Sequence, residues 1–282
     1  MQTFHSTEQL RSVLAAERAA GKRIGLVPTM GNLHAGHIAL VEQALEESDI
    51  VVATIFVNPL QFAAGEDLDK YPRTLADDQQ KLIAAGCHYL FAPTEAEVYP
   101  DGREKQTMVE VPEVSDLYCG ASRPGHFQGV ATIVCKLFGM VQPDIAVFGE
   151  KDYQQLYVIR RMTRDLSLPI EIQGSPIVRN EAGLALSSRN GYLNADEMER
   201  ATALNQVLKR THDAIVAGHR HYTELEESAQ KQLEEVGFKR DYFVIVRQSD
   251  LLPANENDQQ LVILAAAYMG PARLLDNQVV NL

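Results

Sequence analysis

Apolar residues follow two alternating patterns along residues 1–180. In one pattern they stand next to each other in short runs, and in the other they recur every three or four positions. Unbroken runs are typical of strands buried in a parallel sheet, and the wider spacing is typical of helices that cover such a sheet. The runs lie at residues 24–27, 50–57, 89–91, 145–148, 170–172 and 177–178, and the helical spacing lies at about 7–20, 36–45, 74–85, 130–141 and 152–166. This alternation predicts an α/β fold with a doubly wound, Rossmann-like parallel sheet.

Local signals predict several element ends. Ser6 followed by Gln9 has the spacing of a capping box, which predicts a helix start. Pro28 and Gly31 predict a turn after the first run, because proline lacks an N–H group and glycine tolerates unusual backbone angles. Residues 93–126 carry several Pro and Gly residues and are expected to be irregular.

The composition changes after Asn190. Residues 195–237 are polar and charged with helical spacing, and Gly218 separates two expected helices. The apolar runs at 242–246 and 261–268 predict antiparallel strands. We therefore expect a Rossmann-like catalytic domain over residues 1–180 and a smaller α+β domain over residues 181–282.

Charge and composition narrow the class of protein. A hydrophobic content of 45% in 282 residues supports a substantial core. No apolar stretch reaches the roughly 20 residues that a membrane helix needs, and the N-terminus lacks a secretory signal pattern, so we expect a cytoplasmic location and no membrane partner. The formal net charge of −12 argues against a nucleic-acid partner and requires a local positive pocket for any anionic substrate. Cys87, Cys119 and Cys135 are widely spaced, which predicts reduced thiols rather than disulfides or a zinc site.

The motif His34-Ala35-Gly36-His37 places two imidazoles where an apolar run gives way to a helix. The unpaired N–H groups of a helix's first turn attract anions, and both rings can address the same anion. A helix N-terminus favours neutral imidazole and a bound triphosphate favours imidazolium, so we expect the charge on the rings to depend on the nucleotide. The alternative is that each histidine is a local cap or a structural residue with satisfied hydrogen bonds.

Three further segments follow predicted strands, at the edge where α/β sheets bind ligands. Asn58 and Gln61 carry amides suited to orienting a hydroxyl and a carboxylate, although a capped turn is the alternative. Residues 149–155 offer Lys151 to phosphates and a glutamine to the same cleft, or else form a solvated helix cap. Residues 186–190 supply two hydroxyls and a guanidinium able to cradle diphosphate.

Taken together, these motifs resemble those of the pantothenate synthetase (pantoate-beta-alanine ligase) family. The resemblance runs nearly end to end and rests on residues 27–37, 56–62, 71–74, 123–127, 148–155 and 186–190, which stand in the family's order. Residues 34–37 alone are also similar to the HIGH motif shared by class I aminoacyl-tRNA synthetases and small nucleotidyltransferases.

The resemblance implies an ATP-dependent ligation in two steps. The carboxylate of (R)-pantoate would attack the α-phosphate of ATP to give pantoyl adenylate and diphosphate, and the amine of β-alanine would then displace AMP to give pantothenate (vitamin B5), on the route to coenzyme A. ATP would arrive as its Mg²⁺ complex, for which Asp77 and Asp78 are candidate outer contacts unless they cap or solvate their helix. The family also implies a homodimer and a C-terminal domain that acts as a lid.

Carried onto this sequence, the family's catalytic residues fall on His34, His37 and Lys151, with His37 as the candidate proton donor. Gln61 and Gln155 would bind pantoate, and Gln61 would also lie near β-alanine. The ATP site would comprise Met30, Gly31, Asn32, Leu33, His34, Ala35, Gly36, His37, Gly149, Glu150, Lys151, Asp152, Val178, Leu186, Ser187, Ser188 and Arg189.

Three other classes of protein fit part of the pattern. A nucleotidyltransferase acting on a phosphate ester would share the phosphate-binding motifs, but the amides of Asn58, Gln61 and Gln155 favour a hydroxy acid. A tRNA synthetase would need an anticodon-binding domain and a basic surface. A noncatalytic nucleotide-binding module is the third alternative.

Overall fold

The computed structural model describes residues 1–63 and 65–282, which divide into two compact units. Unit 1 comprises Met1–Glu150 and Gln155–Pro176, and unit 2 comprises Lys151–Gln154 and Ile177–Leu282. The short segment Lys151–Gln154 lies within the Rossmann-like part of the sequence but packs with the C-terminal residues. Lys151 therefore belongs to unit 2.

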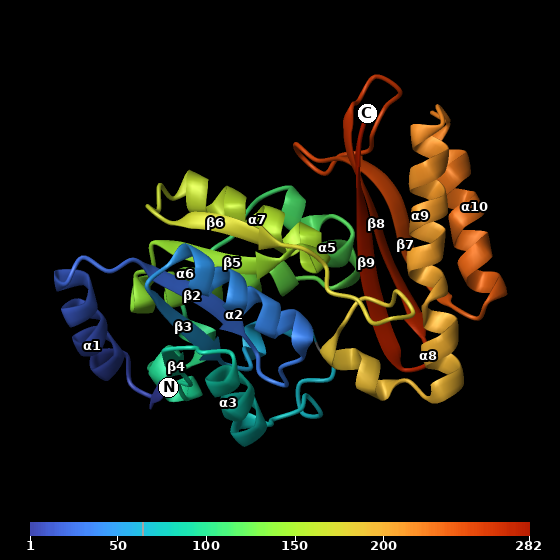
Figure 1. Cartoon of the computed structure of the whole chain (residues 1–282). Helices are drawn as coiled ribbons and strands as arrows, with labels where there is room; N and C mark the ends of the chain where they lie inside the picture. Colours follow the sequence, from blue (N-terminus) through green and yellow to red (C-terminus); the bar gives the residue numbers. More distant parts are fainter. Residues whose placement is uncertain (64) are drawn as a thin grey trace. The chain divides into compact units, whose positions relative to one another are not determined.

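Unit 1 is built on a six-stranded parallel sheet with the order β1-β4-β3-β2-β5-β6 (Figure 1). The strands are β1 (Gln2–Phe4), β2 (Ile24–Thr29), β3 (Ile50–Ile55), β4 (Tyr89–Phe91), β5 (Ile145–Gly149) and β6 (Glu171–Ser175). The chain changes direction across the sheet between β2 and β5, and doubly wound sheets bind ligands beyond the carboxyl ends of the strands at this point. The predicted Rossmann-like fold is confirmed.

Helices cover both faces of this sheet because side chains alternate along each strand. Helices α2 (Ala35–Glu47) and α3 (Leu75–Ala84) pack on one face, where Val41 and Leu82 join a cluster with Val147. The next residue, Phe148, faces the other way and meets Phe138 of α6 (His126–Val141), with ring centroids 6.4 Å apart. The other helices and short 3-10 turns of this part of the chain are α1 (Thr7–Ala19), η1 (Pro59–Gln61), α4 (Glu95–Val98), η2 (Arg103–Lys105), η3 (Val114–Asp116), α5 (Cys119–Ser122), η4 (Glu150–Asp152) and α7 (Tyr153–Asp165).

Two local predictions for unit 1 are wrong. The turn expected at Pro28 starts later, because β2 continues through Pro28 and Thr29 in register with β3. Strand β5 pairs with β2 only at Gly25 and Leu26, and a strand with one neighbour tolerates proline as an edge strand does. The capping box at Ser6 does not form, since Ser6 makes no side-chain cap bond.

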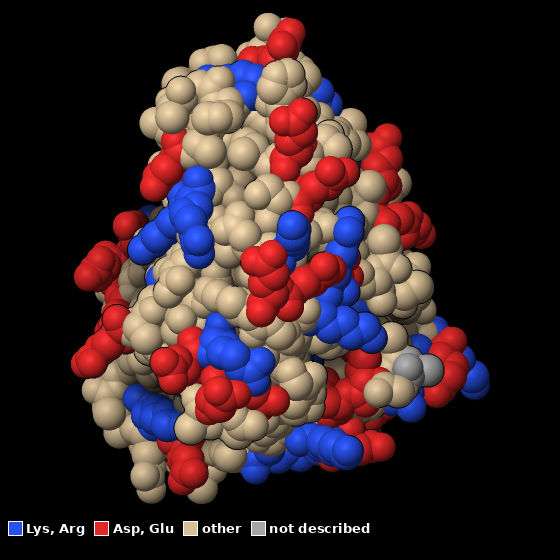
Figure 2. Space-filling model, turned by 90° about the vertical axis from the view of Figure 1, so that its right-hand side faces the viewer, with Lys and Arg blue, Asp and Glu red and all other residues tan. Residues whose placement is uncertain are grey.

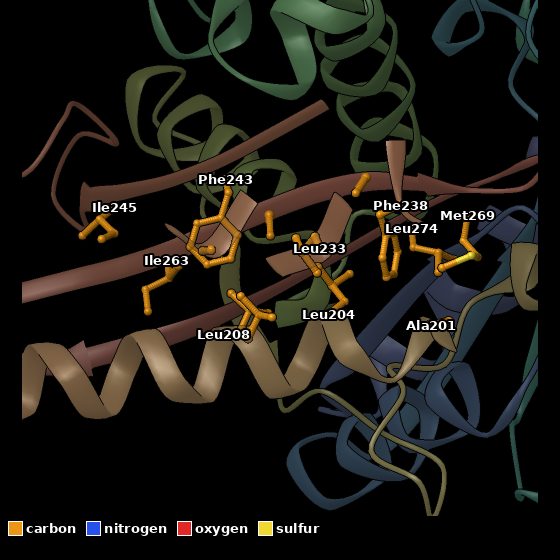
Figure 3. Packing of buried hydrophobic residues seen from close by; sticks show 14 of the residues in the cluster. Ala201, Leu204, Leu208, Leu233, Phe238, Phe243, Ile245, Ile263, Met269 and Leu274 are labelled. Atoms are coloured by element: carbon orange, nitrogen blue, oxygen red, sulfur yellow. The ribbon is translucent and has the colours of Figure 1, made fainter. Parts of the chain in front are cut away.

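Unit 2 contains the three-stranded antiparallel sheet β7-β8-β9, which confirms the predicted α+β character. Its strands are β7 (Lys239–Arg247), β8 (Gln260–Met269) and β9 (Ala272–Asn281), and its helical elements are η5 (Ser188–Tyr192), α8 (Ala195–Ala201), α9 (Ala203–Val216) and α10 (Tyr222–Glu235). Leu204 and Leu208 recur at helical spacing on α9 and pack toward Phe243 of the sheet (Figure 3).

Unit 2 departs from the predicted pattern at three places. The helical segment holds three helices rather than two, and residues 177–178 form no strand: the only described pairing nearby is an isolated bridge between Arg179 and Ala185. Strand β9 was not expected. Asp276 and Asn277 interrupt its apolar pattern, yet both are buried.

Two observations describe the surface and the helices of the described residues. Across residues 1–63 and 65–282, no helix is long and apolar enough to cross a membrane. On the face drawn in Figure 2, Lys and Arg lie interspersed with Asp and Glu. This face therefore presents mixed charge rather than a basic patch.

Candidate active site

His34 and His37 lie at the start of α2, and each uses one ring nitrogen to cap the helix. Nδ1 of His34 accepts the N–H of Gly36 at 3.1 Å, and Nδ1 of His37 accepts the N–H of His34 at 3.3 Å. The two ring centroids are 4.1 Å apart. Because each Nδ1 accepts a hydrogen bond, a neutral ring carries its proton on Nε2. Both histidines therefore do cap the helix. In a neutral ring held by this cap, Nε2–H is the remaining donor.

Helix α3 holds the turn between β2 and α2. Gly31 and Asn32 both have positive φ, 82° and 50°, so this turn needs residues that tolerate the left-handed region. The buried carboxylate of Asp78 accepts the N–H of Asn32 at 2.9 Å and that of Leu33 at 2.8 Å. The ammonium of Lys81 donates to the Leu33 carbonyl at 2.8 Å.

These bonds show that Asp78 holds the turn before α2, a role that the sequence did not suggest. Its carboxylate also accepts the Thr74 hydroxyl at 3.1 Å, so three donors surround it. Asp78 neither solvates its helix nor projects as an outer magnesium contact, whereas Asp77 is exposed. Leu33, a predicted ATP contact, has its side chain in the core and both backbone polar groups paired. These contacts fix the shape of the turn, and a contact of Leu33 with ATP stays a prediction.

Asn58 caps the turn η1 after β3 and is 1% exposed. Its Oδ1 accepts the Leu60 N–H at 3.3 Å and the Tyr99 hydroxyl at 2.7 Å. Its Nδ2 donates to the Gly129 carbonyl at 3.1 Å and to Oε1 of Gln61 at 3.1 Å. All four hydrogen-bonding positions of this amide are thus occupied. The expectation that Asn58 itself orients a substrate is wrong, and the capped turn is the correct alternative.

The backbone of Gln61 is held by the Arg-Pro-Gly-His-Phe segment at residues 123–127. The Gln61 carbonyl accepts from Nδ1 of His126 at 2.8 Å and from Arg123 at 3.2 Å. Arg123 also forms two bonds to the carboxylate of Glu66, at 2.6 and 2.7 Å. Burial is the largest single effect and opposes charge on Glu66, but the hydrogen bonds and charge of Arg123, the Ala63 N–H and the nearby His126 together outweigh it and lower the pKa of Glu66. Gln61 therefore projects from a backbone fixed by an ion pair.

Lys151 lies in the turn η4, between the end of β5 and the start of α7. Its side chain is 17% exposed, and its ammonium lies 3.7 Å from Oδ2 of Asp152. Nδ2 of Asn277, on β9 of the same unit, donates to the Lys151 carbonyl at 3.0 Å. Gly149 and Glu150 end the neighbouring part of unit 1, and Gln155 lies half-buried on the first turn of α7.

The remaining predicted nucleotide contacts form a loop of unit 2. The Val178 carbonyl accepts the Leu186 N–H at 2.9 Å, and the Ser187 hydroxyl accepts the Arg189 N–H at 3.2 Å. Arg179 ties this loop to β9 through Asp276, whose side chain is 2% exposed. Ser187, Ser188 and Arg189 thus project from a capped turn and not from an open loop.

The structure assembles the predicted residues into two groups. In unit 1, residues 30–37, 58–61 and 149–150 follow β2, β3 and β5, which are neighbouring strands. Lys151, Asp152, Val178 and residues 186–189 belong to unit 2. No group of three or more His, Cys, Asp or Glu side chains within the described ranges could hold a metal ion.

Sequence reasoning did not foresee that three residues hold these groups, namely Asp78, Tyr99 and Asn277. Asp78 carried a signal, because it stands four residues before the buried Leu82 and so shares its helix face. Tyr99 and Asn277 make their bonds to residues 41 and 126 positions away. No local pattern could have found them.

A family model described as pantoate-beta-alanine ligase matches residues 2–279. The chain belongs to the pantoate-beta-alanine ligase family. It is accordingly a ligase that forms pantothenate from pantoate and β-alanine, and the family, fold class and activity expected from the sequence are confirmed.

Relatives that match this chain over nearly its whole length are named pantothenate synthetase or pantoate-beta-alanine ligase. The pantothenate synthetase of Pseudomonas entomophila is 58% identical over 282 residues, covering 100% of this chain and 98% of the relative. That of Pseudomonas fluorescens is 59% identical over 277 residues, covering 98% and 97%. The crystal structure of pantothenate synthetase from Thermus thermophilus matches with a TM-score of 0.92 at 46% identity over 99% of both chains. The pantoate-beta-alanine ligase of Francisella tularensis, solved with beta-gamma ATP and β-alanine, matches with a TM-score of 0.82 at 33% identity, covering 99% of this chain and 97% of that one.

Proposed function

We propose that this ligase uses ATP to activate pantoate as pantoyl adenylate and then transfers the pantoyl group to β-alanine. In the first step a pantoate carboxylate oxygen bonds to the α-phosphorus, and the bond to the departing diphosphate breaks. In the second step the amine of β-alanine bonds to the acyl carbon, the acyl–oxygen bond breaks, AMP leaves and the amine loses a proton. The Francisella ligase solved with beta-gamma ATP and β-alanine supports two of the three substrates.

The observation that carries this proposal is the pair of histidines at the start of α2. Both rings are oriented by Nδ1 caps and can offer Nε2–H donors beyond the carboxyl end of β2. Donors fixed in advance stabilise the charge that develops on phosphate oxygens without reorganising during the step. His34 and His37 thus stabilise the transition state of adenylate formation, and His37 is the candidate proton donor.

Lys151 and Arg189 supply the positive charge that the net balance of −12 lacks. Lys151 acts on the phosphates as a point charge, and Arg189 offers a planar set of donors to diphosphate oxygens. Ser187 and Ser188 contribute hydroxyls beside Arg189. The other nucleotide contacts are the turn residues Met30, Gly31, Asn32, Ala35 and Gly36, together with Gly149, Glu150, Asp152, Val178 and Leu186.

Gln61 and Gln155 bind pantoate in this proposal, and Gln61 also lies near β-alanine. A neutral amide suits a substrate that carries both a hydroxyl and a carboxylate, because it can donate to either oxygen without a competing charge. The protein contributes mainly position and electrostatics, since an acyl phosphate forms by in-line attack once the groups are held in place.

Magnesium enters as part of the nucleotide substrate, held by phosphate oxygens and water. We further propose a cytoplasmic homodimer in which residues 1–180 form the catalytic domain and residues 181–282 act as a lid over the nucleotide.

The test is to supply MgATP, pantoate and β-alanine and to follow AMP and diphosphate. AMP release that does not need both organic substrates would rule out the ligase mechanism in favour of another nucleotidyltransferase. Lys151→Ala is expected to slow adenylate formation by about 10²-fold, the scale of losing one transition-state charge partner. Lys231→Ala on α10 is the matched control, because Lys231 is an exposed lysine of the same unit. Diphosphate release at the wild-type rate in Lys151→Ala would remove Lys151 from the mechanism.

A further inference from the structure

Tyr99 is joined to Gln61 by two hydrogen bonds through Asn58. The Tyr99 hydroxyl lies 2.7 Å from Oδ1 of Asn58, and Nδ2 of Asn58 lies 3.1 Å from Oε1 of Gln61. Tyr99 and Asn58 are only 2% and 1% exposed, whereas Gln61 is half-buried. The chain of bonds therefore runs from two buried side chains to one that can reach a ligand.

Backbone groups fix the direction of every bond in this chain. The Leu60 N–H can only donate, so the Asn58 atom facing it is the oxygen. The Gly129 carbonyl can only accept, so the Asn58 atom facing it is the nitrogen. Since Nδ2 of Asn58 also faces Gln61, the Gln61 atom turned toward it must be its oxygen. The NH₂ group of Gln61 consequently points away from Asn58.

We propose that Tyr99 is a positioning residue: its hydroxyl holds the Asn58 amide, whose orientation Leu60 and Gly129 set, in the place from which Gln61 presents its NH₂ group to the acidic substrate. The inference rests on the proposed function, in which Gln61 binds pantoate. An amide that presents its donor side attracts the oxygens of a hydroxy acid, whereas the same amide turned over would set its own oxygen against the carboxylate. Tyr99 thus acts on substrate selection without touching the substrate.

The residues around Tyr99 hold its ring in place and keep its hydroxyl protonated. Its ring meets Phe56 edge-on with centroids 6.0 Å apart, and the ammonium of Lys136 lies 5.4 Å from its centre. Burial and the nearby Glu95 carboxylate raise the pKa of Tyr99, so its hydroxyl keeps its proton. Because Oδ1 of Asn58 is an acceptor, that proton is donated to Asn58 across the working pH range.

Tyr99→Phe tests this assignment, because it removes the hydroxyl and keeps the ring. We expect the KM for pantoate to rise about fivefold or more, which is the effect expected when one buried hydrogen bond is lost. The KM for ATP and kcat should each change less than twofold. Tyr89→Phe is the matched control: the Tyr89 hydroxyl donates to Glu17 at 2.6 Å in the same unit and has no bond to Asn58 or Gln61. Tyr89→Phe should leave both KM values unchanged, even where it lowers the melting temperature as much as Tyr99→Phe.

Gln61→Glu separates this inference from the proposed function. Its carboxylate can still accept from Asn58 but sets a negative oxygen where the NH₂ group stood, so the KM for pantoate should rise at least tenfold. An unchanged KM in Gln61→Glu would mean that Gln61 does not bind pantoate, and the proposed function fails at that residue. A raised KM in Gln61→Glu with an unchanged KM in Tyr99→Phe would overturn the role of Tyr99 alone. Equal rises in the KM for ATP and pantoate in Tyr99→Phe would also overturn it, because they indicate general loosening.

Discussion

The side chains around the turn before α2 hold its backbone, and two of them belong to the proposed site. The Nδ1 caps of His34 and His37 hold the helix start and leave Nε2 for the proposed contact with ATP. Asp78 does not reach the ligand side at all, since its carboxylate accepts two N–H groups of the turn. The position of both imidazoles therefore depends on a buried carboxylate on another helix.

Asp78→Asn should disturb this turn with little change in volume. Whichever way the new amide faces, its NH₂ group opposes the N–H of Asn32 or Leu33, which costs about 1–3 kcal/mol in unfolding free energy. We expect kcat/KM for ATP to fall about tenfold or more, because displaced rings meet the phosphates poorly. Asp77→Asn on the exposed side of the same helix is the control and should match the wild type in both assays. An Asp78→Asn enzyme with wild-type kcat/KM for ATP would contradict the role given to this turn.

At the scale of single residues, the sequence suggested roles that stay predictions, and it did not reveal the hydrogen-bond partners that the structure shows. His34, His37 and Gln61 stood out because their types and places suit anions and acids. At Asn58 the prediction was wrong. Its amide suggested a substrate contact, but its hydrogen-bonding positions are taken by protein groups that include Tyr99 and Gly129. The distinction depends on residues 41 and 71 positions away, which no local spacing reveals.

At the scale of elements, the start of α1 shows how a distant residue replaces a local signal. Ser6 stands at the N-cap without a side-chain bond, and the carboxylate of Glu97 accepts the N–H of Thr7 at 2.8 Å instead. Helix N-termini favour a nearby negative charge, which makes a carboxylate a suitable cap. The cap therefore ties α1 to α4.

Glu97→Ala should cost about 1 kcal/mol in unfolding free energy, as cap removal does, and Ser6→Ala should cost almost nothing. Hydrogen bonds from Thr7 lower the pKa of Glu97 below its ordinary value of 4.5. A carboxylate with a lowered pKa in the folded state stabilises it above that ordinary value and loses this contribution as the pH falls through the lowered one. Denaturant titrations from pH 7 downward should show the gap between wild type and Glu97→Ala narrowing below pH 4.5. A gap that is independent of pH would contradict the charged cap.

Elements were predictable where apolar residues are continuous. Strands β3, β4 and β5 coincide with apolar runs because both of their faces are covered. Strand β9 was not predicted because two of its buried positions carry polar side chains, Asp276 and Asn277. Asp276 pairs with Arg179, and Asn277 donates to the Lys151 carbonyl. Polar residues that hold a loop in place interrupt the pattern that identifies a strand.

At the scale of the whole molecule, two compact units carry the predicted residues. The sequence predicted a division near residue 180, and the C-terminal unit begins at Ile177 but also takes in Lys151–Gln154. Such a segment cannot be assigned from composition, because it packs with residues far away in the sequence, and the bond between Asn277 and Lys151 is one of these contacts. The lysine proposed to act on the phosphates is thereby joined to the C-terminal strand.

The central claim is that pantoate is activated before β-alanine takes part. Exchange of labelled diphosphate into ATP measures this most directly, since it needs reversible adenylate formation. We predict exchange that requires pantoate, proceeds without β-alanine and is slowed by Lys151→Ala. Exchange that occurs only when β-alanine is present, or that does not depend on pantoate, would contradict the account.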